Sequence, residues 1–286
     1  MVLWITSVGR SGNTFFRIVM HHIYGIRTYA AFNASEVLRA AGAGELVGAE
    51  ELPSPLREAM QSGDPERIRL ALTELDARKE LYVFKTHAKA DELFDTRFRA
   101  ILILRDGRDA IASYAHYLVD LRFDAKAFRH RLRKMRRSKS ELLSAASWAH
   151  LAKVVLVSGM KRFGLRKRLV SWRIDHLLDQ HHRLHFHWTT MNRSWLDREP
   201  KPSVVYFNDL IRDPVTTVTN AVEKLGIGLV PDPGAAIPSF AELQRKYASF
   251  FRKGSSGDWK NHFSPAQHER FRIEHETMMR RLGFPI

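Results

Sequence analysis

Four short stretches of the sequence place glycines, cations and an imidazole at spacings suited to binding an anion and moving a proton. These stretches are Gly9 to Thr14, Lys85-Thr86-His87, Arg105 with Ser113, and Arg252 to Phe263. Glycine permits the tight turns that bring backbone N–H groups close to an oxyanion, and arginine makes bidentate contacts with phosphate. A histidine near its usual pKa can take a proton from a hydroxyl or an amine. Taken one at a time, each stretch also fits an ordinary turn or a structural side chain.

The first of these stretches, Gly9-Arg10-Ser11-Gly12-Asn13-Thr14, lies between an apolar strand predicted at residues 3–5 and a helix predicted at 15–23. A turn at a helix N-terminus presents backbone N–H groups and the positive end of the helix dipole, which favours phosphate or sulfate. Arg10 and the hydroxyls of Ser11 and Thr14 add donors. The turn resembles a P-loop but lacks the Gly-Lys-Ser/Thr ending that serves nucleoside triphosphates, which disfavours an ATPase or a kinase.

Three further apolar runs predict buried strands, and each run ends in polar residues. The runs are residues 81–84 before Lys85, 100–104 before Arg105, and 204–207 before Asn208. In an open α/β sheet the ligand lies at the carboxyl ends of the strands. Helices are predicted over 52–78 with breaks at the prolines, from 110, over 214–225 and over 265–282. This alternation predicts a doubly wound α/β fold with a central, mainly parallel sheet, whereas the poorly patterned residues 28–48 are expected to form a surface excursion.

Length and composition describe a globular protein of a reducing compartment. The 286 residues, 44% of them hydrophobic, suffice for one large domain over residues 1–286. There is no cysteine, which excludes disulfides and zinc–thiolate sites. Because the first predicted strand starts almost at Met1, we expect no cleaved signal peptide, no N-terminal anchor and a cytoplasmic location.

Nearly all of the net charge lies in one segment. Residues 126–173 hold fifteen Lys or Arg and one acid, Glu141, so they carry +14 of the chain's +15. We interpret residues 120–187 as a strongly basic helical insertion. Its apolar stretch, 142–157, is not expected to span a membrane, because one crossing would leave strands of a single sheet on opposite sides. Two interpretations stay open: a helix packed on the core with a solvated basic face, or a surface for peripheral contact with an anionic acceptor or membrane.

Four histidines near the end of this insertion, His181, His182, His185 and His187, can be read as a metal site. Two of them, His181 and His185, are spaced by one helical turn. Without cysteine or a nearby pattern of carboxylates, we favour a cationic surface or a wall of the acceptor site, and we predict no bound metal.

In their order along the chain, the four stretches resemble the sulfotransferases of the cytosolic and bacterial type, which use 3′-phosphoadenosine 5′-phosphosulfate (PAPS). The most specific piece is the closing Arg-Lys-Gly-x-x-Gly-Asp-Trp-Lys-x-x-Phe at residues 252–263. The resemblance covers residues 1 to about 118 and about 203–284, and leaves out the basic insertion. It implies a P-loop-like fold, PAPS as the sulfuryl donor, no metal, and release of adenosine 3′,5′-bisphosphate.

The resemblance also implies roles for individual residues. His87 would be the general base, with Lys85 and Arg10 stabilising the charge that grows on the transferred group. The residues implied in donor binding are Arg10, Ser11, Gly12, Asn13 and Thr14 for the phosphosulfate, Phe15, Phe207, Ser239 and Phe240 for the adenine, and Arg105, Ser113, Arg252, Lys253 and Gly254 for the ribose phosphate.

Three positions depart from the family's usual pattern. Arg10 stands where cytosolic members usually have lysine, which keeps the positive charge. Phe15 replaces the usual tryptophan. The run Phe207-Asn208-Asp209-Leu210 stands where Tyr-Glu-Asp-Leu is typical, which removes a hydroxyl expected to touch the adenine.

The sequence thus predicts transfer of a sulfuryl group from PAPS to a hydroxyl or an amine of an acceptor. We expect the acceptor to be anionic or presented on an anionic surface, such as a glycan or a lipid headgroup, because of the basic insertion. The alternative is a protein that binds nucleic acid or anionic membranes on an inactive sulfotransferase scaffold. The presence of His87, Lys85, Arg105 and Ser113 disfavours such a decayed site.

Overall fold

The computed structural model describes residues 1–31, 44–90, 97–121, 165–179, 187–247 and 251–286, together with positions 148, 152, 155 and 159. Most of the basic insertion lies outside these described residues, as do His181, His182 and His185. The chain divides into two compact units. The first unit comprises Met1–Asp106, His181–Glu242 and Thr277–Pro285, and the second comprises Gly107–Gln180, Leu243–Glu276 and Ile286. The expectation of a single domain over residues 1–286 stays a prediction.

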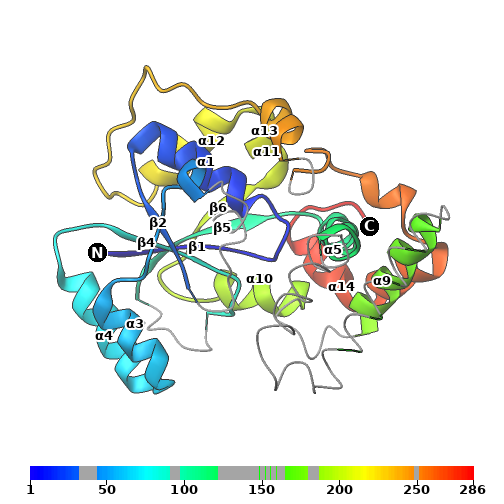
Figure 1. Cartoon of the computed structure of the whole chain (residues 1–286), viewed down its shortest axis with the longest axis horizontal. Coiled ribbons are helices and arrows are strands. Elements are labelled where there is room, and N and C mark those ends of the chain that lie inside the picture. Colours follow the sequence, from blue (N-terminus) through cyan, green and yellow to red (C-terminus); the bar gives the residue numbers. More distant parts are fainter. Residues whose placement is uncertain are drawn as a thin grey trace. The chain divides into compact units, whose positions relative to one another are not determined.

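The first unit is built on a six-stranded sheet whose paired strands all run parallel (Figure 1). In space the strands follow the order β3-β2-β4-β1-β5-β6. Their bounds are β1 (Val2–Ser7), β2 (Thr28–Ala30), β3 (Ala49–Glu50), β4 (Tyr82–Thr86), β5 (Arg99–Leu104) and β6 (Ser203–Tyr206). The predicted α/β class with a parallel central sheet is confirmed.

Apolar side chains make β1 the centre of this sheet. All six of its residues are buried, and Trp4 lies opposite Phe84 of β4 and Ala100 of β5. Helices cover both faces of the sheet in the first unit, as expected for parallel strands joined by crossover helices. In Figure 1, α1 (Asn13–Tyr24), α11 (Phe207–Arg212) and α12 (Pro214–Glu223) lie on one side, and α10 (Trp188–Leu196) lies on the other.

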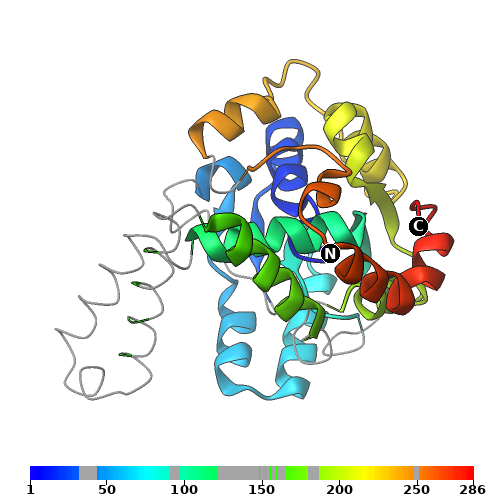
Figure 2. The ribbon, with the colours of Figure 1, turned by 90° about the vertical axis from the view of Figure 1, so that its right-hand side faces the viewer.

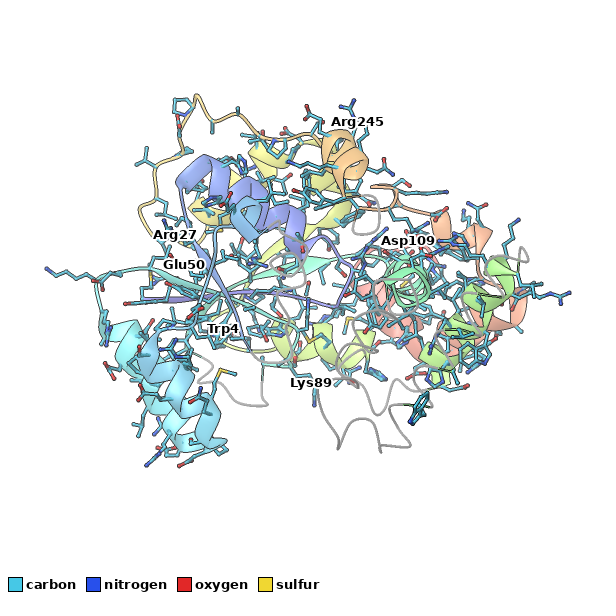
Figure 3. The ribbon with its side chains drawn as sticks, in the orientation of Figure 1. Trp4, Arg27, Glu50, Lys89, Asp109 and Arg245 are labelled. Atoms are coloured by element: carbon cyan, nitrogen blue, oxygen red, sulfur yellow. The ribbon has the colours of Figure 1, made fainter. Side chains whose placement is uncertain are left out.

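Residues 28–48 were expected to form a surface excursion, but β2 lies inside the sheet between β3 and β4. A buried arginine of α1 holds it there: Arg17 donates from Nε and Nη2 to Thr28 Oγ1 at 2.9 and 2.6 Å, and Thr28 Oγ1 donates to the Val47 carbonyl at 2.8 Å. At the outer edge, Arg27 and Glu50 form an ion pair and point toward one another in Figure 3. Strands of three and two residues are too short to show the alternation that identifies a strand in a sequence.

The predicted helical break at residues 63–65 is confirmed, whereas the break predicted at Pro55 is wrong, because Pro55 lies in the first turn of α3 (Ser54–Ser62), where a proline is tolerated. Helix α3 ends at Gly63, whose φ of 68° is left-handed, and α4 (Pro65–Ala77) begins directly afterwards. Asp64 caps α4, because its carboxylate accepts a hydrogen bond from the Glu66 N–H at 2.9 Å. A short 3-10 helix, η1 (Gly44–Val47), precedes β3.

The second unit is helical in its described part. It contains α5 (Gly107–Leu121), α9 (Arg166–Asp179) and the short 3-10 helix η2 (Asp258–Asn261), together with most of α13 (Phe240–Lys246) and α14 (Pro265–Arg281). α5 packs against both α9 and η2. Figure 2 shows α9 beside α14, where Gln267 Nε2 donates to the Ser171 carbonyl at 3.1 Å. Among the described helices of the chain, none is long and apolar enough to cross a membrane.

Candidate functional site

The turn between β1 and α1 contains two residues with left-handed backbone conformation and leads into the N-terminus of α1. Arg10 and Gly12 have positive φ values of 67° and 96°, and Gly12 is the N-cap residue of α1. A Cβ atom on Gly12 would lie 2.7 Å from Phe207 Cδ2, so this position requires glycine for both its conformation and its close contact. The turn therefore presents the N-terminus of a twelve-residue helix.

Side chains alternate between buried and half-exposed positions along this turn. Ser11 and Asn13 are buried, whereas Arg10 and Thr14 are half-exposed. The amide of Asn13 donates from Nδ2 to the Ile5 carbonyl at 3.2 Å, which ties the turn to β1. The Ser11 hydroxyl is buried and has no hydrogen-bond partner among the residues that the structure describes. Such a group can donate to a bound anion without giving up an existing bond.

Arg105 directly follows β5 and contacts the same turn through a hydrogen bond to its backbone. Its Nη1 donates to the Arg10 carbonyl at 2.8 Å, and its guanidinium carbon lies 4.1 Å from the centroid of the Phe207 ring. Its own carbonyl accepts a hydrogen bond from Trp188 Nε1 at 2.9 Å. The structure thus places this buried arginine against the turn, and its predicted contact with the ribose phosphate stays a prediction.

Phe207 was predicted as the last residue of a strand, but that prediction is wrong. β6 ends at Tyr206, and Phe207 is the first residue of α11. The run Val204-Val205-Tyr206-Phe207 is apolar throughout, so hydrophobicity alone does not mark the change from strand to helix. The ring of Phe207 is buried against Gly12 and Arg105.

His87 follows β4 and has a defined tautomer. Its Nδ1 lies 2.7 Å from the Ser7 carbonyl oxygen. A carbonyl only accepts hydrogen bonds, so Nδ1 carries the proton and Nε2 of the neutral ring keeps its lone pair. Burial, followed by the nearby Lys85 ammonium, lowers the pKa of His87 to about 3. The imidazole is therefore unprotonated at neutral pH, as a general base must be.

Two phenylalanines predicted around the adenine lie together. Phe15 of α1 and Phe240 of α13 meet edge to face, with ring centroids 5.6 Å apart and an interplanar angle of 83°. Ser239 caps the same helix: its hydroxyl and its backbone N–H both donate to Glu242 Oε2 at 2.8 Å. Its hydroxyl is thus engaged in a capping box, which makes Ser239 a residue that sets the start of α13.

In the second unit, the loop with Arg252, Lys253 and Gly254 is folded around two acids. Arg252 Nη1 and Lys253 Nζ donate to the Asp258 carboxylate at 2.5 and 2.7 Å. The carboxylate of Asp109, in the first turn of α5, accepts hydrogen bonds from the backbone N–H groups of Gly257 and Trp259 at 2.7 and 2.9 Å.

The same helix, α5, carries Ser113, which is 4% exposed. Gly254 and Gly257 have φ values of 61° and 82°, which favour glycine at both positions. Asp109 and Asp258 were not predicted as site residues. Their positions could have indicated them, because Asp109 lies between Arg105 and Ser113 and Asp258 lies within residues 252–263. An acid among neighbours of opposite charge is a candidate counter-ion for them.

The histidines of the basic insertion give no metal site in the described part of the chain. His187 caps α10, because its Nδ1 accepts a hydrogen bond from the Thr190 N–H at 3.0 Å. Within the ranges that the structure describes, no three His, Asp or Glu side chains gather as potential metal ligands.

Comparisons with known proteins show the family of this chain. A family model described as "Sulfotransferase domain" matches residues 2–283. Sulfotransferase 2A2 of Mus musculus is 30% identical over an alignment of 126 residues, and the match covers 34% of this chain and 41% of that protein. The 3-alpha-hydroxysteroid sulfotransferase of Cavia porcellus is 30% identical over an alignment of 119 residues, and the match covers 34% of this chain and 40% of that protein. The matched region thus spans less than half of the length of these curated relatives.

A solved structure extends the similarity to nearly the whole chain. Mouse sulfotransferase SULT7A1, crystallised in complex with PAP, aligns with a TM-score of 0.53 at 16% identity and covers 98% of this chain and 84% of that one. At this identity the likeness shows the fold. The fold with its central parallel sheet is therefore shared with that protein.

Proposed function

The chain belongs to the sulfotransferase domain family, and on that basis we propose that it transfers a sulfuryl group from PAPS to a hydroxyl or an amine. The product would be adenosine 3′,5′-bisphosphate. The observation that carries the proposal is His87, whose neutral ring keeps a basic Nε2 at the carboxyl end of a strand directly beside β1. The PAP complex of the structurally similar mouse protein supports PAPS as the donor.

The turn at the start of α1 fits the phosphosulfate end of the donor. Its helix N-terminus and left-handed backbone favour an oxyanion. The buried Ser11 hydroxyl, which lacks a partner among the described residues, supplies a donor for that anion. Arg10 is half-exposed beside it and supplies the positive charge. Bound PAPS would contribute the sulfuryl group and the phosphate on which the leaving group's charge develops.

In the proposed mechanism, the first unit supplies one general base, His87, and two cations, Lys85 and Arg10. His87 Nε2 takes the proton of the acceptor hydroxyl or amine as the acceptor attacks sulfur. Lys85, buried in β4, and Arg10 stabilise the negative charge that grows on the transferred group and the leaving oxygen. The His87 imidazole, whose pKa is about 3 in the free protein, would become a stronger base next to the negative charges of a bound donor.

This function is tested by following the label of sulfur-35 PAPS into a panel of alcohols, amines, glycans and lipids. Transfer to any acceptor, with stoichiometric formation of adenosine 3′,5′-bisphosphate, is the expected result. A chain that binds the bisphosphate but labels no member of the panel, glycans and anionic lipids included, would refute the transferase proposal.

We further propose that the acceptor is anionic or lies on an anionic surface, because residues 126–173 of the basic insertion carry +14 of the chain's +15. The same charge favours the second candidate, a binder of nucleic acid or anionic membranes on an inactive scaffold. That candidate predicts binding with a steep salt dependence and no turnover of PAPS. The cysteine-free composition fits a cytoplasmic location, which stays a prediction.

A further inference from the structure

Four donors converge on one buried carboxylate in the second unit. Arg252 Nη1 and His262 Nε2 lie 2.5 and 3.0 Å from Asp258 Oδ2, and Lys253 Nζ and Asn261 Nδ2 lie 2.7 and 3.0 Å from Oδ1. The Asp258 side chain is 3% exposed, whereas that of Lys253 is 52% exposed. The buried Asp258 carboxylate thus binds the Lys253 ammonium, whose side chain is also exposed to solvent.

The carboxylate stays ionised in this setting. Burial by itself would raise the pKa of Asp258, but hydrogen bonds from Lys253, Asn261 and Arg252 lower it well below the usual range. One negative charge against two permanent positive charges leaves the group with a net charge of about +1 when His262 is neutral. The four donors occupy the acceptor positions of the two carboxylate oxygens. Arg252 and Lys253 each have further N–H groups that do not donate to Asp258.

A second acid fixes the loop that carries Asp258. Asp109 is fully buried in the first turn of α5 and binds the backbone N–H groups on both sides of Asp258, those of Gly257 and Trp259. The loop is therefore anchored to the helix that also carries Ser113. Backbone and side-chain contacts together determine where the Arg252 and Lys253 head groups lie.

We propose that Asp258 is a positioning residue for the donor's ribose phosphate: it fixes the directions in which Arg252 and Lys253 present their remaining N–H groups to that phosphate. This inference rests on the proposed function, because the phosphate is that of PAPS. The opposite effect of a carboxylate is also chemically conceivable, since a negative charge beside two cations can compete with an anionic ligand for them. The two effects change the affinity in opposite directions when the charge is removed.

The test compares adenosine 3′,5′-bisphosphate with adenosine 5′-monophosphate, which lacks the ribose phosphate concerned. Calorimetric titration of the full chain with Asp258→Asn should give a Kd for the bisphosphate raised by about tenfold or more, because the amide is uncharged and offers one acceptor oxygen where the carboxylate offers two. The Kd for the monophosphate should stay within about twofold, because this nucleotide lacks the phosphate that is proposed to bind Arg252 and Lys253. A loss of general stability would weaken both ligands together, so the ratio of the two Kd values separates positioning from folding.

Two further variants complete the design. Asp258→Glu keeps the charge but moves it by one methylene, and should also weaken the bisphosphate selectively. Asp175→Asn removes one negative charge from α9 in the same unit, where Asp175 pairs with Arg270, and should leave both Kd values unchanged.

Unchanged or tighter binding of the bisphosphate by both Asp258 variants, with monophosphate binding intact, would overturn the proposal in favour of competition or of no effect. If Asp258→Asn loses both ligands, the Asp258→Glu result decides between positioning and competition. Failure of the native chain to bind the bisphosphate would refute the donor site itself, an outcome distinct from a failure of the Asp258 variants.

Discussion

Among single residues, His87 is the one on which the proposed proton transfer depends, and a backbone carbonyl determines which of its ring nitrogens carries the proton. Because Nδ1 of His87 donates to Ser7, Nε2 is the nitrogen that can act as a base. The surroundings that lower its pKa to about 3 keep it unprotonated but also make it a weak base in the free protein. Under the proposed mechanism, the negative charge of a bound donor would raise this pKa and increase the basicity of Nε2.

Replacing this histidine separates chemistry from binding. His87→Gln should reduce kcat by about 10²–10⁴, the usual contribution of a general base, because glutamine cannot take the proton. The Kd for adenosine 3′,5′-bisphosphate should stay within about twofold, since the lost ring is a base and not an anion ligand. Single-turnover transfer of sulfur-35 and calorimetry measure the two quantities. A kcat within threefold of the native value would remove His87 from the mechanism.

Gly12 has a left-handed backbone conformation and a close neighbour in Phe207, so its substitution should destabilise the fold both by backbone strain and by a steric clash. Gly12→Ala places a Cβ 2.7 Å from Phe207 at a φ of 96°, and we expect a loss of about 2–4 kcal/mol in the free energy of unfolding. Weaker binding of both adenosine nucleotides should accompany it. Gly63→Ala is the matched control, because its φ of 68° is also left-handed but no atom lies within 4 Å.

Urea unfolding compares the two glycine variants. The control should lose about 1 kcal/mol from backbone strain alone. Equal losses in both variants would show that the contact with Phe207 is not what fixes glycine at position 12.

Among the elements, α5 contributes His116 and the residue after η2 is His262, and the two side chains form a pair. This pair should make the stability of the second unit decrease at acid pH. His116 of α5 is 5% exposed, and its Nε2 lies 3.3 Å from Nε2 of His262. Burial, followed by the charges of Arg252 and His262, lowers the pKa of His116 to about 3, although Asp120 opposes the shift. An unfolded histidine has a pKa of about 6.5.

The sign of the effect follows from proton binding. Between pH 6.5 and about 3 the unfolded chain binds a proton at position 116 that the native chain does not. Stability is therefore unaffected above pH 6.5 and is lost as the pH falls, by at most about 1.4 kcal/mol per pH unit for this group. His116→Gln should flatten the decline of the unfolding free energy between pH 6.5 and 4.5 in urea titrations. An identical decline in the native chain and the variant would contradict the assignment.

The elements also show how far the sequence could predict the fold. The strands at β1, β4, β5 and β6 were predictable because each contains an apolar run followed by polar residues, although β6 is not fully buried as predicted: Tyr206 is exposed. β2 and β3 were not, since three and two residues carry no period and their place depends on Arg17, Thr28 and Val47, which meet only in the folded chain.

The site shows the same division. The residue types of the turn, of Lys85-Thr86-His87 and of the closing loop were readable from the sequence. Their partners were not: Asp109 and Gly257 are 148 positions apart, and the contact of Phe207 with Gly12 needs the helix α11 that hydrophobicity did not reveal. Local patterns specify which groups are available, whereas long-range packing decides what they touch.

At the scale of the whole molecule, the uneven distribution of charge points to the acceptor. Replacing Arg131, Arg133, Arg136 and Arg137 by glutamine should raise the KM for an anionic acceptor severalfold, because attraction to the basic insertion is lost, while the Kd for adenosine 3′,5′-bisphosphate stays unchanged. These positions lie outside the described residues, so this prediction depends on the sequence. Steady-state kinetics at low and physiological salt provide the measurement.

A matched variant controls for net charge. Arg57, Arg67, Lys201 and Arg212 are well-exposed cations of the first unit, and their replacement by glutamine removes the same charge outside the insertion. The control should leave the acceptor KM near the native value. Equal increases in both variants would mean that overall charge, and not the insertion, attracts the acceptor.

The central claim is that the chain binds a donor with two separate anionic ends. Calorimetric titration with adenosine 3′,5′-bisphosphate, adenosine 5′-monophosphate and ATP tests it without knowledge of the acceptor. The account predicts that the bisphosphate binds about 100-fold tighter than the monophosphate, because the ribose phosphate adds several charge-assisted hydrogen bonds, and that ATP binds weakly. Equal affinity for the bisphosphate and the monophosphate, or no binding of either, would contradict the proposed donor site.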